Sequence, residues 1–271
     1  VIAKKLYNPR IIFFCDDTFL FNKSYLTEFA KQYGEKVGIP FHCSAIPNFF
    51  NEEVVDALVE AGLHAVDVGV QSLNPETRLS VFGRKESNDQ YTAFISMMRK
   101  RGVYTVSDHI INPWDTRENL KRQLLSYSEA RPHWINVFHL QYFPDTKVIE
   151  EAVRDGHLAP EAVDGIGEGN INSYFRGGDI QEIMKSLHDL VVLLQFVPVL
   201  PRGLTKLIIG SPLLLLFKIM PTQVLLLLRG LNALFRAKDQ PGRLYLKMLF
   251  LSLIKCRLTP SSSQLNAIKE L

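Results

Sequence analysis

The feature that most constrains the fold is an alternation of strand-like and helix-like segments over the first half of the chain. Five short segments rich in β-branched and aromatic residues are typical of strands, and amphipathic segments lie between them. The strand-like segments are residues 10–15, 39–46, 64–70, 103–111 and 134–141. This alternation predicts parallel βαβ units, because a helix between two strands returns the chain to the same end of the sheet.

The helices between these strands carry their own start and stop signals. Small polar residues that accept hydrogen bonds from a first helical turn precede them, and glycine follows most of them. The predicted starts are Ser24, Asn51, Ser87 or Asn88, and Thr116, and the predicted ends are Gly38, Gly62, Gly102 and Ala130. We therefore predict an α/β fold in which residues 1–155 form a partial (β/α) TIM-like barrel.

The rest of the chain, residues 156–271, differs in composition. Its first part is rich in glycine, and prolines then separate a series of apolar, helix-like segments. Residues 201–257 hold ten Lys or Arg residues against one Asp, although the whole chain has a net charge of only +3. This mainly helical region is open to three interpretations: a packed bundle, a surface helix that contacts an anionic membrane peripherally, or a membrane span interrupted by charge and proline.

The cysteines and the common motifs exclude several classes of function. Cys15, Cys43 and Cys256 are far apart, which argues against a disulfide framework and favours a reducing, cytoplasmic location, at most peripheral to the inner membrane face. The chain has no phosphate-binding glycine loop and no nucleophile elbow. We expect no bound nucleic acid and assign no catalytic residue and no metal ligand from the sequence.

Polar residues gather where the predicted strands end. Asp16 and Asp17 follow the first strand directly, and either cap the next helix or face a ligand. Alternation in residues 65–72 directs Gln71 to the barrel interior, away from the valines. By the same parity His42 and Ser44 share a face, as do Thr105, Ser107 and His109. Ligands of such barrels bind at the carboxyl ends of the strands, so we expect a polar ligand there.

Five motifs in order resemble the core of radical S-adenosylmethionine enzymes, especially the cobalamin-binding class. They are FFCDDTF, FHCSAIPN, EAGLHAVDVGVQSLN, DHIINPWDTREN and INVFHLQYFPDT, within residues 1–150. The resemblance implies S-adenosylmethionine and a [4Fe-4S] cluster as cofactors, with cobalamin as a further candidate, and an electron donor protein as a partner. It also implies that a 5′-deoxyadenosyl radical abstracts hydrogen from the substrate.

The resemblance also assigns positions to S-adenosylmethionine. The two aspartates lie where the family reads the amino group of the methionine moiety. The end of the 64–70 strand lies near the ribose or carboxylate, the end of the 39–46 strand lies close to the same ligand, and the turn after residue 111 cradles the adenosine side. The residues at these positions are Asp16, Asp17, Ser44, Asn48, Gln71, Ser72 and Asn112.

The chain departs from the family pattern in two respects. The turns at residues 112–116 and 144–146 lack the glycines of the family, and the CxxxCxxC motif of the cluster is absent. In the family that motif lies upstream of the first segment seen here, so we expect a fragment that is inactive alone. Cys15 and Cys43 stand on separate strands and are interpreted as buried, inert thiols.

Two alternatives remain from the residues themselves. A metal-dependent hydrolase would place a metal at the barrel mouth between His42, His109, His139, Asp16, Asp17 and Asp108. A degenerate barrel would act as a membrane-associated scaffold without catalysis. The basic, apolar stretch 201–257 additionally suggests a small-molecule or lipid-like substrate collected at a membrane.

Overall fold

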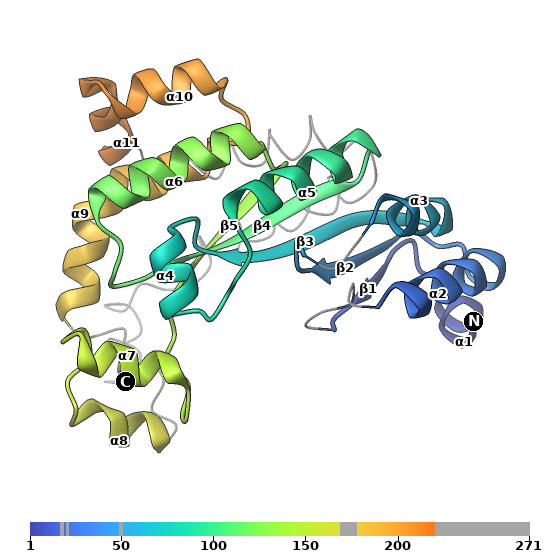
Figure 1. Ribbon diagram of the computed structural model, residues 1–271, viewed down its shortest axis with the longest axis horizontal. Coiled ribbons are helices and arrows are strands. Elements are labelled where there is room, and N and C mark those ends of the chain that lie inside the picture. Colours follow the sequence, from blue (N-terminus) through green and yellow to red (C-terminus); the bar gives the residue numbers. More distant parts are fainter. Residues whose placement is uncertain (17–18, 20–21, 49–50, 169–177, 220–271) are drawn as a thin grey trace, which may run out of the picture. The chain divides into compact units, whose positions relative to one another are not determined.

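The computed structural model describes residues 1–16, 19, 22–48, 51–168 and 178–219 (Figure 1). Within them, one sheet holds five strands in the order β1-β2-β3-β4-β5, and all four neighbouring pairs are parallel. The strands are β1 (Ile12–Phe14), β2 (Phe41–Ala45), β3 (Leu63–Gln71), β4 (Tyr104–Ile111) and β5 (Trp134–His139). This sheet confirms the predicted α/β partial barrel, with its strands in chain order.

Helices connect the strands as the sequence predicts. They are α1 (Ile2–Tyr7), α2 (Lys23–Lys36), α3 (Glu52–Ala61), α4 (Pro75–Ser80), α5 (Asn88–Lys100) and α6 (Arg117–Ala130). Asn51 caps α3, and Ser87 and Thr116 form capping boxes at α5 and α6. The predicted cap of α2 is wrong: Asn22, not Ser24, accepts the hydrogen bond of the Tyr25 N–H at 3.1 Å. The N-cap lies two residues before Ser24, and the Ser24 hydroxyl donates to the same Asn22 Oδ1 at 2.8 Å.

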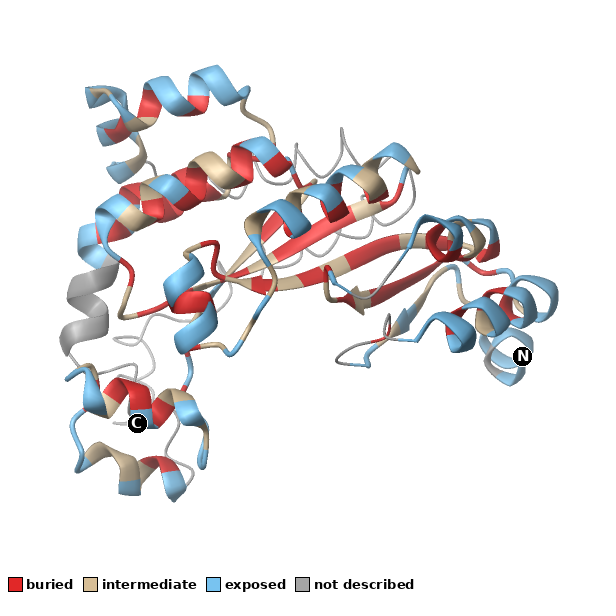
Figure 2. Cartoon of the chain, in the orientation of Figure 1, coloured by how far each residue is buried: buried red, intermediate tan, exposed pale blue. Residues whose placement is uncertain are grey.

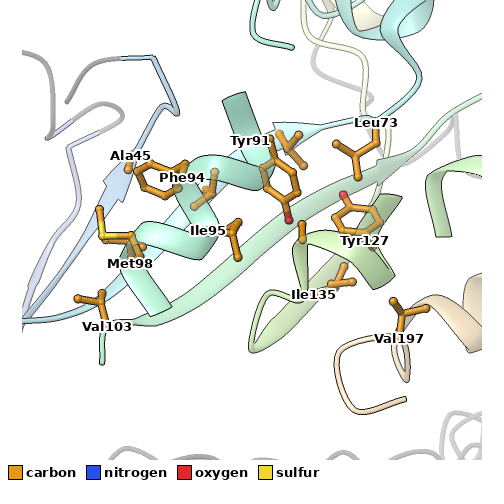
Figure 3. Close-up of a cluster of buried hydrophobic side chains, with 14 of the residues drawn as sticks. Ala45, Leu73, Tyr91, Phe94, Ile95, Met98, Val103, Tyr127, Ile135 and Val197 are labelled. Atoms are coloured by element: carbon orange, nitrogen blue, oxygen red, sulfur yellow. The ribbon is translucent and has the colours of Figure 1, made fainter. Parts of the chain in front are cut away.

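One face of the sheet packs against helices. Figure 1 shows α5 and α6 running along the same side of β3, β4 and β5, and Figure 2 shows that this interface is buried. Four residues of α5 are almost fully buried, and Figure 3 shows them with Tyr127 of α6: Tyr91, Phe94, Ile95 and Met98. The rings of Tyr91 and Tyr127 meet edge to face with centroids 6.0 Å apart. The opposite face, called the inner face below, corresponds to the interior of a barrel.

The chain continues in further helices after β5. They are α7 (Lys147–Arg154), α8 (Ala162–Gly167), α9 (Gly178–Leu194), α10 (Arg202–Ile209), the 3-10 helix η2 (Pro212–Leu214) and α11 (Leu215–Lys218). Apolar residues of the second half of α9 share the main core with the sheet. The helical character of this region confirms the prediction as far as Ile219; most of the basic stretch 201–257 lies outside the described residues.

The compact unit that contains the sheet extends well beyond residue 155, where the composition of the sequence changes. Residues Val1–Ile219 form one compact unit, and residues 220–271 lie outside the described part. The predicted division at residue 155 stays a prediction. No helix in the described part is both long enough and apolar enough to cross a membrane.

Candidate functional site

The carboxyl ends of the five parallel strands meet at one edge of the sheet, where α/β folds bind their ligands. Five of the predicted ligand residues lie at or just beyond these ends. Asp16 follows β1 and is exposed, Asn48 lies in the exposed turn after β2, Gln71 ends β3, Ser72 follows it, and Asn112 follows β4. Asp17 lies outside the described residues. The topology thus brings the predicted residues of separate motifs to the same edge.

Gln71 is held in an unusual backbone conformation at the end of β3. Its φ angle is +61°, in the left-handed region that side chains other than glycine rarely adopt, and the register with β4 shifts between Gly69 and Gln71. Such a conformation costs on the order of 1 kcal/mol and persists where the surrounding structure fixes it. The bulge turns the side-chain amide of Gln71 back over Gly69. A β-carbon added to Gly69 would lie 3.1 Å from Gln71 Nε2.

Arg84 joins Gln71 at this position and was not predicted. Its Nη2 would lie 3.5 Å from a β-carbon on Gly69, so the guanidinium and the Gln71 amide both lie over the glycine. The side chain is half-buried, and within the described residues its guanidinium forms no ion pair or hydrogen bond. An unpaired guanidinium beside an amide donor is suited to a carboxylate or phosphate.

Ser72 and Asn112 are committed to contacts within the fold. The Ser72 hydroxyl donates to Gln123 Oε1 at 2.9 Å and accepts from the Asn74 N–H at 3.1 Å. The Asn112 amide donates to the Ile110 carbonyl at 3.0 Å, and its oxygen accepts from the Trp114 N–H at 3.1 Å. Both residues are buried. They shape the edge of the sheet, and their direct contact with S-adenosylmethionine stays a prediction.

A buried carboxylate, that of Asp115, fixes the turn after β4. Asp115 accepts from the Asn112 N–H at 3.0 Å and from Gln123 Nε2 at 3.1 Å. Burial raises the pKa of Asp115 to about 6, against the lowering effect of these two hydrogen bonds. Gln123 of α6 also accepts from the Leu73 N–H at 2.8 Å, so one side chain joins the end of β3 to this turn.

A row of polar side chains crosses the inner face. His42 Nε2 of β2 lies 3.1 Å from Asp67 Oδ1 of β3, and Asn136 of β5 donates to Asp108 Oδ1 of β4 at 2.9 Å. Trp134 Nε1 donates to the Asn136 amide oxygen at 2.9 Å. Burial, with the nearby Asp67 carboxylate, raises the pKa of Asp108 despite the hydrogen bond from Asn136. Ser44 lies half-buried on β2 and pairs in register with Asp67.

Thr105, Ser107 and His109 share a face of β4, as the parity predicts, but that face meets the helices. Ser107 Oγ lies 2.5 Å from the hydroxyl of Tyr91 on α5, and His109 Nδ1 lies 3.1 Å from the hydroxyl of Tyr127 on α6. Burial lowers the pKa of His109 to about 3. The prediction that this set lines the polar interior is therefore wrong; Asp108, one residue out of phase, faces inward.

This parity also separates the residues of the metal alternative. His109 and His42 lie on opposite faces of the sheet, and His139 pairs in register with Ile111, a residue of the helix-packed core. Among the described residues no three His, Cys, Asp or Glu side chains come together as a metal site. This geometry gives no support to a metal-dependent hydrolase.

The thiols in the described part do not fit an iron–sulfur cluster. Cys43 is buried in β2 as predicted, but the predicted burial of Cys15 is wrong, because this residue follows the edge strand β1 and is exposed. Burial raises the pKa of Cys43, an effect that the neighbouring Asp67 and Asp16 carboxylates reinforce, so this thiol stays protonated. Cluster ligands are thiolates, usually several on one short loop. Cys256 lies outside the described residues, and the sequence has no CxxxCxxC.

Comparison with known proteins identifies the barrel segment. Residues 2–122 match the sequence model of the Radical SAM superfamily. This segment belongs to the radical SAM superfamily. The match covers the strands β1 to β4 and the edge at which Gln71 and Arg84 converge.

Two curated relatives and one solved structure resemble the chain. An oxygen-independent coproporphyrinogen III oxidase of Paracoccus denitrificans is 29% identical over 159 residues, which are 52% of this chain and 35% of that protein. An uncharacterised methyltransferase of Pyrococcus horikoshii is 28% identical over 156 residues, which are 56% of this chain and 33% of that protein. The chain thus spans about a third of the length of these relatives.

The radical SAM methyltransferase TsrM of Kitasatospora setae, solved with cobalamin and a [4Fe-4S] cluster, superimposes with a TM-score of 0.50. The alignment covers 56% of this chain and 30% of that one at 17% identity. A likeness at this level of identity supports the α/β fold.

Proposed function

We propose that this chain binds S-adenosylmethionine at the carboxyl edge of the sheet and serves a radical S-adenosylmethionine enzyme. One observation carries the proposal: the Gln71 amide and the Arg84 guanidinium converge over Gly69, inside the segment that matches the superfamily. A strained strand end, a missing β-carbon and a guanidinium that pairs with no described residue favour a ligand carboxylate at this place over a purely structural role.

The residues present fit the amino-acid end of S-adenosylmethionine. Arg84 and Gln71 donate to the carboxylate of the methionine moiety, because both side chains present N–H groups at the same place. Asp16, exposed at the neighbouring end of β1, supplies negative charge for the ammonium group. The Asn112–Asp115 turn, fixed by buried hydrogen bonds, forms the wall for the adenosine side.

When bound, S-adenosylmethionine supplies the adenosyl group that, in this superfamily, removes a hydrogen atom from the substrate. The chain's own residues bind and orient the molecule and exclude water from the inner face. The described thiols do not fit the cluster, so the proposal for these residues stops at binding and orientation. Use of cobalamin, an electron donor protein and a lipid-like substrate remain predictions of the sequence.

Isothermal titration of the full 271-residue chain with S-adenosylmethionine and with S-adenosylhomocysteine tests the proposal. We expect saturable binding of both, and a loss of roughly tenfold or more in Arg84→Ala, as removal of a charge-assisted donor pair gives. Arg122→Ala is the matched control, because Arg122 pairs with Glu118 on the exposed side of α6. Absence of binding in the parent chain, or equal binding by Arg84→Ala, would overturn the proposal.

We also propose that the helices α10 and α11 contact an anionic membrane surface peripherally. Their large exposed apolar residues are Leu204, Leu207, Leu215 and Leu216. Arg202, Lys206 and Lys218 lie among them, and residues 201–219 include no acidic residue. Apolar side chains flanked by cations are typical of helices that lie in the headgroup region of anionic lipids.

Sedimentation with vesicles tests this surface. We expect binding to phosphatidylcholine vesicles that contain phosphatidylglycerol, weaker binding at high salt, and loss of binding in the double variant Leu207→Glu/Leu216→Glu. Leu79→Glu is the control, since Leu79 is an exposed leucine on α4, away from this surface. Absence of sedimentation with anionic vesicles at low salt would contradict the proposal.

A further inference from the structure

The polar row on the inner face contains one buried histidine, His42, with a ring nitrogen that lacks an aligned hydrogen bond to any described residue. The side chain of His42 is only 8% exposed, and its Nε2 forms no aligned hydrogen bond with any described residue. Its contact with Asp67 Oδ1, at 3.1 Å, is an ion-pair distance without hydrogen-bond alignment. A buried nitrogen left in this state costs free energy unless a further group completes its environment.

The row holds two carboxylates: Asp67 lies beside His42, and Asp108 lies one strand farther across the sheet. Asp67 keeps 35% of its side chain exposed toward the inner face. Asp108, on the next strand, accepts from Asn136 at one oxygen, and no described residue donates to the other. Neither forms an ion pair with a described Lys or Arg residue, and Arg84 lies over Gly69 without pairing to either one. With both carboxylates ionised, the row carries a net negative charge whether His42 is neutral or charged.

Aromatic side chains flank the row on both outer strands of the sheet. Phe13 of β1 pairs in register with His42, its ring centroid lies 4.8 Å from the imidazole, and 51% of it is exposed. Phe138 of β5 is two residues beyond Asn136 on the same face and is 50% exposed. Carboxylates and aromatic faces both attract organic cations, so the two kinds of group favour the same ligand.

We propose that the row of His42, Asp67 and Asp108 binds a protonated amine carried by the substrate, with Phe13 or Phe138 packing on the apolar body beside it. The inference deepens the proposed function, because it names the substrate class of a barrel whose carboxyl edge binds S-adenosylmethionine. The two sites adjoin but use different groups: Arg84 and Gln71 favour an anionic group over Gly69, which pairs in register with Asp108, whereas Asp67 lies four residues before Gln71 in the strand.

Three probes of equal shape and different charge test the row on the full chain. They are phenethylamine, 2-phenylethanol and phenylacetate, followed by saturation-transfer NMR and titration calorimetry. We expect phenethylamine to bind at least roughly tenfold more tightly than the neutral and anionic probes. Saturating S-adenosylhomocysteine, titrated first, should leave the binding of phenethylamine unchanged.

Variants then assign the binding to the row. Asp67→Asn should weaken phenethylamine roughly tenfold and leave S-adenosylhomocysteine binding unchanged. Glu60→Gln, which removes an exposed charge from α3 on the helix-covered side, should change neither. Phe13→Ala, at an exposed position that the fold tolerates, should weaken phenethylamine severalfold and serves if Asp67→Asn does not fold.

The outcomes separate this inference from the proposed function. Equal binding of the three probes, absence of phenethylamine binding, or unchanged affinity in Asp67→Asn overturns the amine site. Displacement of phenethylamine by S-adenosylhomocysteine also overturns it, because the row would then belong to the cofactor. Failure of S-adenosylhomocysteine to bind while phenethylamine binds with the expected selectivity overturns the proposed function and supports the amine site.

Discussion

Arg117 on α6 and Asp189 on α9 form a bidentate ion pair, although they lie 72 residues apart in the sequence. Arg117 Nη1 lies 2.8 Å from Asp189 Oδ1 and Nη2 lies 2.7 Å from Oδ2. Asp189 is only 5% exposed. Burial raises the pKa of this carboxyl, but the hydrogen bonds and charge of Arg117, together with backbone N–H groups, outweigh that effect and lower it. This pair therefore ties α9 to the helix layer of the barrel.

Removal of Arg117 should leave the buried Asp189 carboxylate without its opposite charge. We expect Arg117→Ala to lower the free energy of unfolding by about 2 kcal/mol, less than for a fully buried pair because the arginine side chain is 45% exposed. Arg117→Lys should cost less than Arg117→Ala, since lysine keeps the charge without the paired geometry. Urea unfolding measures both values.

Arg122→Ala provides the control for this experiment. Its ion pair with Glu118 is exposed on both sides and should contribute less than about 1 kcal/mol. Equal stability losses in Arg117→Ala and Arg122→Ala would contradict a stabilising role for the pair with Asp189.

The stability of the β4–α6 turn should depend on pH through Asp115. Its pKa is about 6 in the folded chain and near 3.8 when unfolded, so the folded state binds the extra proton between these values. Stability from this group is present below about pH 4 and is lost as pH rises through 6, by about 3 kcal/mol. Urea unfolding at pH 4 and pH 7 should show this loss relative to Asp115→Asn; parallel behaviour of the two proteins would refute it.

His109 should act in the opposite direction. Its pKa falls from 6.5 to about 3 on burial, so the folded state binds fewer protons between these values. Stability from the neutral imidazole is present above pH 6.5 and falls by about 3 kcal/mol on acidification to pH 4. In the parent chain this change offsets that of Asp115, which is why single variants are needed to separate them.

The variant pair His109→Phe and His109→Phe/Tyr127→Phe isolates the histidine. The single variant removes the pH dependence but leaves the buried Tyr127 hydroxyl without its 3.1 Å partner, at a cost of about 1 kcal/mol. The double variant should regain that cost, because both polar groups are then replaced. An unchanged acid dependence in both variants would show that His109 is not its source.

Local patterns were sufficient to predict the strands and most helix caps. Asn51, Ser87 and Thr116 each cap the helix predicted for them, since a cap depends only on residues within one turn. The α4 helix was missed: Asn74 and Pro75 start it, but it has only six residues and no apolar face that periodicity could show.

Long-range features of the site could not be predicted in the same way. Alternation shows which residues share a face of β4, but both faces carry polar side chains, so the pattern does not decide which face is inward. Ser107 and Asp108 illustrate this, because the partner of each lies on another element. Arg84 reaches Gly69 only after α4 has folded back, and no periodic signal marks it.

The left-handed conformation of Gln71 separates ligand binding from stability. Glycine adopts a φ of +61° without strain, so Gln71→Gly relieves the backbone while it increases the entropy of the unfolded chain. These effects oppose each other, and we expect the free energy of unfolding to change by less than about 1 kcal/mol. Loss of the amide should nevertheless weaken S-adenosylmethionine binding severalfold, measured by calorimetry.

Asp145→Gly is the matched control for this variant. Asp145 has a φ of +59° in the exposed turn before α7, so the same substitution makes the same change in backbone freedom away from the edge of β3. It should shift stability to a similar extent and leave the affinity for S-adenosylmethionine unchanged. If Gln71→Gly binds S-adenosylmethionine as tightly as Asp145→Gly does, the strained glutamine serves the fold of the strand end and not the ligand.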